Sequence, residues 1–485
     1  MLDSSERHPR GLAVLYLTEV WERFSFYGMK ALLVLYLNDG VLSEERFSKV
    51  LGSGLVVHLF GQPEDAQQVQ QLSSALNELY AGVAYLTPLA GGLIADGILG
   101  ARTTLLLGGV LMAAGHACMA FEPFFLCGLV LLVLGNGGFK PTITAMLSKL
   151  YEPPGPTALR DRGFAIFYTG INVGALLAPI ICGALQQSIG YDAGFGAAGI
   201  GMVVGLLTFI AGSPWLRHPP SKAERRVSGE DGLATPLVPS GGSTSPTHEP
   251  LEEPLLPQQW SGQSMLALLG LCGCVVPFWV PFEQLSNVVP LFFRHQTDRR
   301  LFGFLLPAAW LQAANPIVCV LCMPLLTSLW ARQARRGAEP SPTSKMAIGC
   351  GLQSISWLLM SLGSIGVNTE DKAPLLLPFC CTLLLTLGQL YLAPIGLALV
   401  SKSCPQHARS TAVGFWFLAG GIGGLLAGPT GALYSRIPPP AFFAMLSAIS
   451  VCASLLMVSV APRLQRWAEA SPVSAAGKVA STFSV

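Results

Sequence analysis

Four charged residues lie within one apolar stretch near the start of the chain. Segment 12–37 is long enough to cross a bilayer, yet it contains Glu19, Glu22, Arg23 and Lys30. A charge at membrane depth costs about 3 kcal/mol or more, so such residues usually mark an ion or substrate pathway. The spacings of three and four residues place them on one helical face, along roughly 16 Å. We interpret this stripe as the wall of an aqueous path rather than a single ion pair.

Two further charges occupy the middle of other apolar segments. Lys140 lies in segment 124–148, and Glu283 follows Pro277 and Pro281 in a segment whose prolines predict a broken helix. Broken helices in transporters line binding sites. We expect Glu283 to pair with Lys140, which would make a neutral set of three acids and three bases. One proton taken up by a glutamate would make that set positive and favour an anionic substrate group.

Each of these polar groups also has a structural interpretation. A lysine can extend toward an interface, although Lys140 has about ten apolar or small neighbours on each side, which disfavours this reading. Singly, Tyr80, Asn172, Asn315 and Gln389 are explained equally well as interhelical hydrogen-bonding groups.

Composition indicates a membrane protein and gives no sign of an enzyme. The chain has 485 residues, of which 51% are hydrophobic and 12% charged, against about 25% charged in soluble domains. A net charge of +2 without a basic aromatic patch gives no basis for nucleic-acid binding. No nucleophile–base pair, phosphate loop or CxxC metal spacing occurs, so we expect no metal and no cofactor other than protons as the coupling ion.

Apolar runs of spanning length predict an all-α membrane protein with twelve transmembrane helices in two sets of six. Their expected bounds are 12–37, 76–98, 103–121, 124–148, 163–188, 193–216, 262–293, 302–330, 346–366, 374–401, 410–434 and 440–461. The expected regions are a tail at 1–11, six-helix bundles at 12–216 and 261–461, a disordered linker at 217–260, and a tail at 462–485. Two halves joined by a long polar loop are typical of major facilitator transporters.

Loop charges predict the orientation. Of the 29 Lys and Arg residues, 19 fall on the side of the N-terminus, 7 on the other side and 3 inside helices. Positive loops face the cytoplasm, so we expect both termini and the linker there. The location would be the cell membrane, or an endolysosomal membrane if the Pro-Leu-Leu-Pro run from Pro254 is a sorting signal. Asp96 and Arg102, in a loop typical of facilitators, are candidate gating residues; the alternative is a simple hydrophilic turn.

Several motifs, in the right mutual order, resemble the proton-dependent oligopeptide transporter family. Glu19-Val-Trp-Glu22-Arg23-Phe-Ser-Phe26-Tyr27-Gly28 is similar to its ExxERFxYYG signature, and Phe167-Tyr168-Thr-Gly-Ile171-Asn172-Val-Gly174 to its FYxxINxG motif. Similar matches surround Lys140, Glu283, Asn315, Gly396 and the run from Gly414. The resemblance covers nearly all predicted helices.

The resemblance implies roles for individual residues. Glu19, Glu22, Arg23 and Glu283 would take part in proton coupling, with Lys140 and Glu283 as a lysine–acid pair. Lys30 would help to hold a peptide carboxylate. Further substrate-binding candidates are Phe26, Tyr27, Tyr80, Lys140, Asn172, Asn315, Gln389 and Trp416.

Three residues depart from the family pattern. Phe26 replaces the usual first tyrosine, and Lys30 replaces an arginine and so lacks its bidentate fork. Gln389 stands where the family usually has a glutamate associated with the peptide amino group, and a neutral amide cannot supply that charge. The departures lie at the substrate end of the site, so we expect substrates with a blocked amino terminus to be accepted.

The expected function is proton-coupled symport of di- or tripeptides or related small carboxylates by alternating access. The expected partners are a small-molecule substrate, protons and the lipid bilayer, with the protein a monomer. The alternatives are transport of another anion or small organic solute, and a non-transporting sensor or scaffold. Retention of Glu19, Glu22 and Arg23 argues against the last of these.

Overall fold

The computed structural model describes residues 8–151, 159–216, 262–368, 370–403 and 409–469. Within these ranges it has twelve helices of 19 residues or more. They are α1 (Arg10–Tyr36), α4 (Ala66–Ile94), α5 (Ala101–Met119), α6 (Phe125–Lys149), α7 (Arg160–Ser188), α8 (Tyr191–Gly212), α10 (Gly262–Glu283), α12 (Ala314–Arg335), α13 (Pro342–Gly363), α14 (Leu376–Ser403), α15 (Arg409–Ala432) and α16 (Pro439–Glu469). Ten stretches of the described chain are long and apolar enough to span a membrane. The all-α prediction is confirmed.

Short elements connect the long helices. They are a π-helical turn at Leu37–Val41, α2 (Glu44–Phe47), α3 (Ser53–Phe60), a second π-helical turn at Ala95–Leu99, α11 (Val288–Gln296), the strands β1 (Arg300–Leu301) and β2 (Phe304–Leu305), and 3₁₀ turns at Glu122–Phe124, Ser213–Leu216, Ala308–Ala313 and Leu433–Ser435. The two strands pair antiparallel, with Arg300 opposite Leu305.

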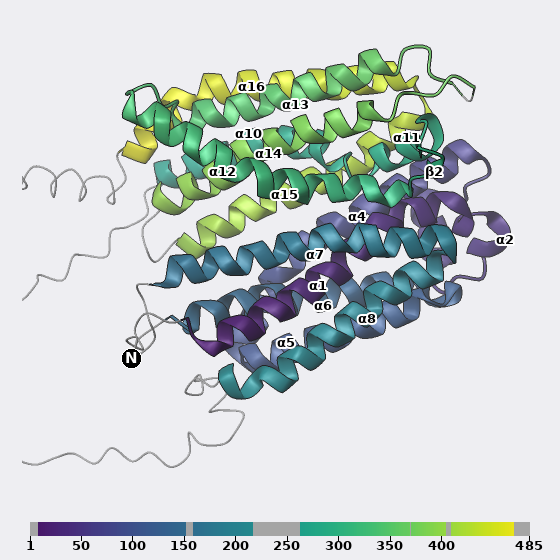
Figure 1. The fold of residues 1–485 in the computed structure, drawn as a ribbon, viewed down its shortest axis with the longest axis horizontal. Coiled ribbons are helices and arrows are strands. Elements are labelled where there is room, and N and C mark those ends of the chain that lie inside the picture. The colour runs from purple at the N-terminus through teal and green to yellow at the C-terminus, as the bar shows by residue number, and fades with distance from the viewer. Residues whose placement is uncertain (1–7, 152–158, 217–261, 369, 404–408, 470–485) are drawn as a thin grey trace, which may run out of the picture.

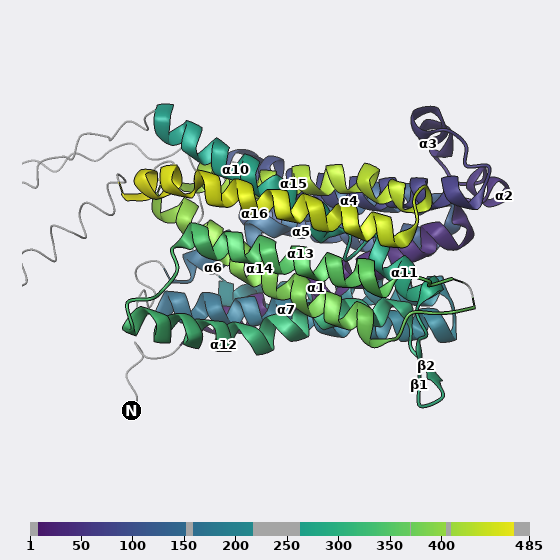
Figure 2. The ribbon, with the colours of Figure 1, turned by 90° about the horizontal axis from the view of Figure 1, so that it is seen from above.

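The long helices run side by side along the long axis of the molecule (Figures 1 and 2). Helices α1 to α8 form one half and α10 to α16 the other, and each half has its own hydrophobic core. Helix α1 begins and α16 ends at the same end of the bundle, which we call the terminal end (Figure 1). The opposite end carries α2, α3 and the β1–β2 hairpin and is called the loop end (Figure 2).

Small residues line the contact between the halves along α4 and α15, which we call the glycine seam. It comprises Ala75 and Gly82 on α4 and Gly424 and Gly428 on α15. The nearest atoms to a Cβ placed on Gly424 would be the Cα and N of Gly82, at 3.5 and 3.6 Å. A Cβ on Gly428 would lie 3.3 Å from the Cα of Ala75. Close backbone approach of this kind is typical of helices packed in membranes.

The second membrane helix begins earlier than hydropathy predicts. We expected it to start at 76, whereas α4 starts at Ala66, where the Asp65 side chain accepts a hydrogen bond from the backbone N–H of Gln68 at 2.7 Å. The first three turns contain polar residues that are nevertheless buried, among them Gln70 and Asn77. Because burial here is against protein rather than lipid, hydropathy does not register it.

Other boundaries also differ from the prediction. The segment from 302 is not helical; Phe302 and Gly303 have φ of 50° and 83° at the tip of the β1–β2 hairpin, and α12 starts at Ala314. Helix α10 runs through Pro277 and Pro281 and ends at Glu283, so the break follows the acid instead of preceding it. Helix α16 extends to Glu469, past the expected start of the tail. The predicted linker at 217–260 lies outside the described residues.

Candidate functional site

A cavity of about 200 Å³ lies between the two halves. Both halves contribute aromatic, amide and charged side chains to its wall. From the first half these include Tyr27, Lys30, Tyr85, Tyr168 and Asn172; from the second they include Trp279, Glu283, Ser286, Gln312, Asn315, Cys319 and Gln389. A mostly apolar cavity with a few convergent polar groups is the usual form of a small-molecule site.

The first-helix acids are held by Arg23. Its guanidinium contacts Glu22 through two nitrogens, Nη2 at 2.6 Å from Oε1 and Nε against Oε2, and its Nε lies 3.3 Å from Glu19 Oε1. All three side chains are buried, and the guanidinium also lies over the Phe26 ring at 5.1 Å. A buried charge cluster is stable only with such mutual pairing. One oxygen of Glu19 remains without a partner, so this carboxylate can accept a proton.

Helix α7 supports this cluster through Gly174. A Cβ at that position would lie 2.5 Å from the carbonyl oxygen of Val20 and 2.8 Å from Arg23 Cβ. Glycine therefore allows α7 to pack directly against the turn of α1 that presents Arg23.

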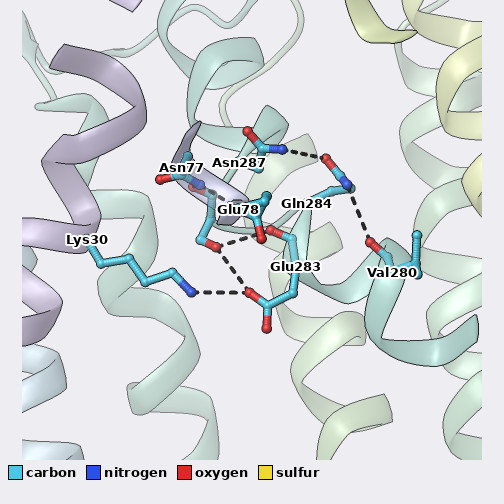
Figure 3. Close-up of polar contacts among 8 residues, drawn as sticks. Lys30, Asn77, Glu78, Val280, Glu283, Gln284 and Asn287 are labelled. Carbon is cyan, nitrogen blue, oxygen red and sulfur yellow. Dashed lines mark hydrogen bonds and ion pairs between the residues drawn. The ribbon is translucent and has the colours of Figure 1, made fainter. Parts of the chain in front are cut away.

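Lys30 and Glu283 form an ion pair between the halves. Lys30 Nζ on α1 lies 3.2 Å from Glu283 Oε2 on α10, and both side chains are at least nine-tenths buried (Figure 3). Ser286 Oγ lies 3.5 Å from the same carboxylate oxygen. The charges of α1 thus divide into an Arg23 cluster and a Lys30 pair that are seven residues, or roughly 10 Å, apart along the helix.

The prediction that Lys140 pairs with Glu283 is wrong for this structure. Lys140 Nζ lies over the ring of Tyr85 at 5.1 Å, and among the described residues it has no carboxylate within ion-pair distance. The charges nearest to it include Arg23, Glu22 and Glu19. Lys140 therefore lies toward the Arg23 cluster, whereas Lys30, two turns further along α1, reaches the acid of the other half.

Neutral amides occupy another part of the cavity wall. Asn315 Nδ2 donates to Gln389 Oε1 at 3.2 Å and to Thr386 Oγ1 at 3.0 Å. Gln312 Nε2 is buried without a partner. On α7, Asn172 Nδ2 donates to the carbonyl oxygen of Tyr168 at 3.1 Å. These groups can bind a polar ligand atom, but they add no charge.

Four predicted substrate residues lie beside the cavity or away from it: Lys140, described above, and Phe26, Tyr80 and Trp416. Phe26 and Tyr80 contact each other with ring centroids 6.4 Å apart, and Tyr80 is 5% exposed. Trp416 is 3% exposed and packs on Gly396 in the core of the second half. The aromatic side chains that this half presents to the cavity are Trp279 and Phe282, which the sequence analysis did not select.

The two ends of the bundle differ in the polar contacts between halves. At the loop end, Arg294 Nη1 of α11 lies 2.5 Å from Asp39 Oδ2 and 3.0 Å from Tyr191 Oη, and Tyr191 also contacts Asp39. We call these three residues the loop-end latch. At the terminal end, Asp96 and Arg102 are exposed and form no ion pair with any described residue, so their gating role stays a prediction.

One buried acid was missed. Glu78 on α4 is 0% exposed; its Oε1 accepts a hydrogen bond from Asn77 Nδ2 at 2.7 Å, and its Oε2 has no partner (Figure 3). The signal that could have found it is its position seven residues, two helical turns, before Tyr85. Within the described ranges, no three or more His, Cys, Asp or Glu side chains are placed to hold a metal ion.

Comparison with known proteins identifies the relatives of this chain. The model of the POT family matches residues 102–228 and 258–444. A peptide transporter of Yersinia enterocolitica is 32% identical over 514 aligned positions, covering 94% of each chain. A di-/tripeptide transporter of Lactococcus lactis subsp. lactis is 30% identical over 505 positions, covering 93% of this chain and 95% of its own.

Solved structures share the fold. A mutant of the peptide transporter POT in complex with sulfate is 25% identical with a TM-score of 0.76, covering 95% of this chain and 96% of that one. A POT family transporter in complex with 5-aminolevulinic acid is 23% identical with a TM-score of 0.74, covering 94% and 97%. The arrangement of two six-helix halves is therefore that of solved transporters.

Proposed function

This chain belongs to the POT family, and from that premise we propose that it is a proton-coupled symporter of di- or tripeptides or related small carboxylates. It works by alternating access, with the two halves opening the cavity first to one side of the membrane and then to the other. The bilayer surrounds a monomer whose termini face the cytoplasm, and the expected location is the cell membrane. The Lactococcus lactis relative is a di-/tripeptide transporter, which supports the substrate class.

The ion pair between Lys30 and Glu283 is the observation that carries this proposal. It joins the halves inside the cavity, and its lysine is the cation that the wall offers to a ligand. Protonation of Glu283 would remove the negative partner and leave Lys30 to bind a substrate carboxylate. A proton and an anionic substrate would then be taken up together, which is the physical basis of coupling.

Glu19, Glu22 and Arg23 form the second part of the coupling machinery. Their cluster faces Lys140, so gain of a proton by Glu19 would leave an excess positive charge near Lys140. The substrate carboxylate would compensate for that charge. We therefore keep Lys140 as a substrate-binding residue in the occupied state.

Uptake into proteoliposomes tests the proposal. With an inward proton gradient, the wild-type protein should concentrate a labelled dipeptide, and Lys140→Ala should abolish this accumulation. Arg46→Ala is the matched control, because Arg46 is an exposed cation whose ion pair with Glu122 lies away from the cavity. If the Lys140 variant accumulates the dipeptide as well as wild type does, the proposal is wrong.

The amide wall favours a second possibility for the ligand. Asn315 and Gln389 are neutral, so the site offers its substrate no negative charge beyond Glu283 among the groups that line the cavity. Dipeptides with an acetylated amino terminus should compete for uptake nearly as well as free dipeptides. A strong loss of competition on acetylation would show that the amino group is recognised after all.

A sensor that binds ligand without moving it is the remaining alternative. Counterflow separates the two functions, because preloaded unlabelled substrate drives entry of labelled substrate only through a transporter. Absence of counterflow, together with retained ligand binding, would favour the sensor.

A further inference from the structure

Glu78 is a fully buried acid that the proposed function does not use. Its Oε2 has no hydrogen-bond partner, and its Oε1 accepts one hydrogen bond, from Asn77. An ionised carboxylate buried in this way is costly, because it accepts fewer hydrogen bonds than its four lone pairs allow. A protonated carboxyl group in the same place is neutral and therefore avoids the cost of burying a charge.

The surroundings of Glu78 contain one cation and one further acid. Lys30 of α1 and Glu283 of α10 are the charged side chains that Figure 3 draws around it. On the side of α15 it faces the glycine seam, where a Cβ on Gly428 would lie 3.3 Å from Glu78 Cβ. Within the described chain, Lys30 contacts Glu283, whereas Glu78 lies in the same group of side chains without a cation in contact (Figure 3).

Charge counting places a proton in this group. The charged groups around the cavity and the Arg23 cluster are four acids, Glu19, Glu22, Glu78 and Glu283, and three bases, Arg23, Lys30 and the half-buried Lys140. The buried Lys345 is outside this set and pairs with Glu339. All ionised, the set carries −1, and one bound proton makes it neutral. Arg23 contacts Glu19 and Glu22, and Lys30 contacts Glu283, so Glu78 is the acid without a cationic contact.

The two acids belong to different halves of the protein. Glu78 and Lys30 are both in the first half, whereas Glu283 is in the second. A rigid-body rotation of the halves preserves distances within a half and changes those between halves. When the cavity opens toward the loop end, Lys30 therefore separates from Glu283 and remains near Glu78.

We propose that Glu78 is a second proton-binding residue of the transport cycle and the alternative partner of Lys30. In the state described here, Glu78 holds the proton while Glu283 pairs with Lys30. In the alternate state a proton bound by the Glu283 carboxylate frees Lys30 for the substrate carboxylate. Once the substrate has left, Glu78 Oε2 releases its proton and Lys30 pairs with Glu78. One O–H bond breaks, one forms, and the net charge of the group does not change. This inference rests on the proposed function.

The test compares wild type with Glu78→Gln in proteoliposomes. The amide keeps the shape of the carboxyl group but cannot release a proton. Proton-driven accumulation should fall at least tenfold and lose its dependence on pH, while counterflow is retained. Glu122→Gln is the matched control, because Glu122 is an acid at the surface. If Glu78 had only a structural role, its replacement would reduce counterflow together with accumulation. Retained counterflow therefore distinguishes proton binding from structural support.

Asn77→Ala provides the second variant, which keeps the acid. The Asn77 amide donates to the carboxylate oxygen at 2.7 Å and so stabilises the ionised form. Without it Glu78 should release its proton only at higher pH, which moves the pH profile of uptake to the alkaline side. The double variant with Glu78→Gln should show no such movement.

The outcomes are distinct. Accumulation and a pH profile equal to wild type in Glu78→Gln overturn this inference and leave the proposed function standing. If Glu78→Gln does not fold, the Asn77→Ala profile decides: an alkaline shift supports the inference and an unchanged profile overturns it. A wild-type protein whose uptake ignores pH refutes the proposed function and this inference with it.

Discussion

Replacing Lys30 should lower the free energy of unfolding more than replacing its partner Glu283. At a separation of 3.2 Å the attraction is about 5 kcal/mol for an effective dielectric constant near 20. Removing one partner of a buried pair typically costs about 3–5 kcal/mol, because the other charge is left buried. Lys30→Gln leaves the ionised Glu283 without a cation in contact and should reach the upper end. Glu283→Gln leaves Lys30 beside Glu78 and should stay near the lower end, about 3 kcal/mol.

Reversible unfolding in mixed micelles, followed by circular dichroism, measures these free energies. The loss in Lys30→Gln should shrink as pH falls, by up to about 1.4 kcal/mol per pH unit for one proton. The sign follows from linkage: the folded variant keeps a proton that the unfolded chain has released, so its stability decreases as pH rises. A Glu283→Gln variant that loses as much stability as Lys30→Gln would refute the reasoning, since Glu78 would then not compensate.

Three further changes test the arrangement of the helices. Arg294→Ala removes the latch contact with Asp39, so Cys319 in the cavity wall should react several-fold faster with a thiol reagent added at the loop end; an unchanged rate contradicts a latch. Gly174→Leu should cost about 1–3 kcal/mol by overpacking α7 against α1, measured as a lower melting temperature. Arg46→Ala should change stability by less than about 1 kcal/mol, because its ion pair is exposed.

Gly351→Leu is the control for the glycine substitution. Gly351 is also inside a long helix, but nothing lies within 4 Å of a Cβ placed there. Its replacement should leave the melting temperature equal to wild type or slightly higher, because leucine is the better helix former. Equal losses in the two variants would show that close approach of α1 and α7 is not the cause.

The helices could be predicted because a lipid environment imposes length and apolarity on each span. The errors occur where lipid is not the neighbour. The first turns of α4 are polar and are buried by protein, so their hydropathy predicts a loop instead of a membrane helix. The apolar residues from Phe302 onward predict a helix. In the structure the chain instead forms a hairpin at Gly303 and a 3₁₀ turn after Pro307 before α12 starts.

The inventory of charges could also be predicted, whereas their pairing could not. Helical spacing places Glu19, Glu22 and Arg23 on one face, and they are in contact. The partner of Glu283 depends on how far along α1 and α6 each lysine lies once the halves are packed, which spacing within one helix does not determine. Glu78 was passed over because a single acid near the start of a predicted span resembles the end of a loop.

The glycine seam has a consequence for kinetics. Side chains that interlock across an interface must disengage before the interface can slide. Gly424 and Gly428 of α15 mostly meet backbone of α4, so the Leu425 side chain, which packs on Gly82, is the main group that has to disengage. Atom pairs in such a contact contribute only about 0.1–0.2 kcal/mol each, so the helices can shift past one another in small steps. Turnover would then be limited by the polar contacts at the ends and in the cavity. Bulkier residues in the seam would slow turnover while leaving the affinity for substrate unchanged, so rate and selectivity would be separately adjustable properties of this protein.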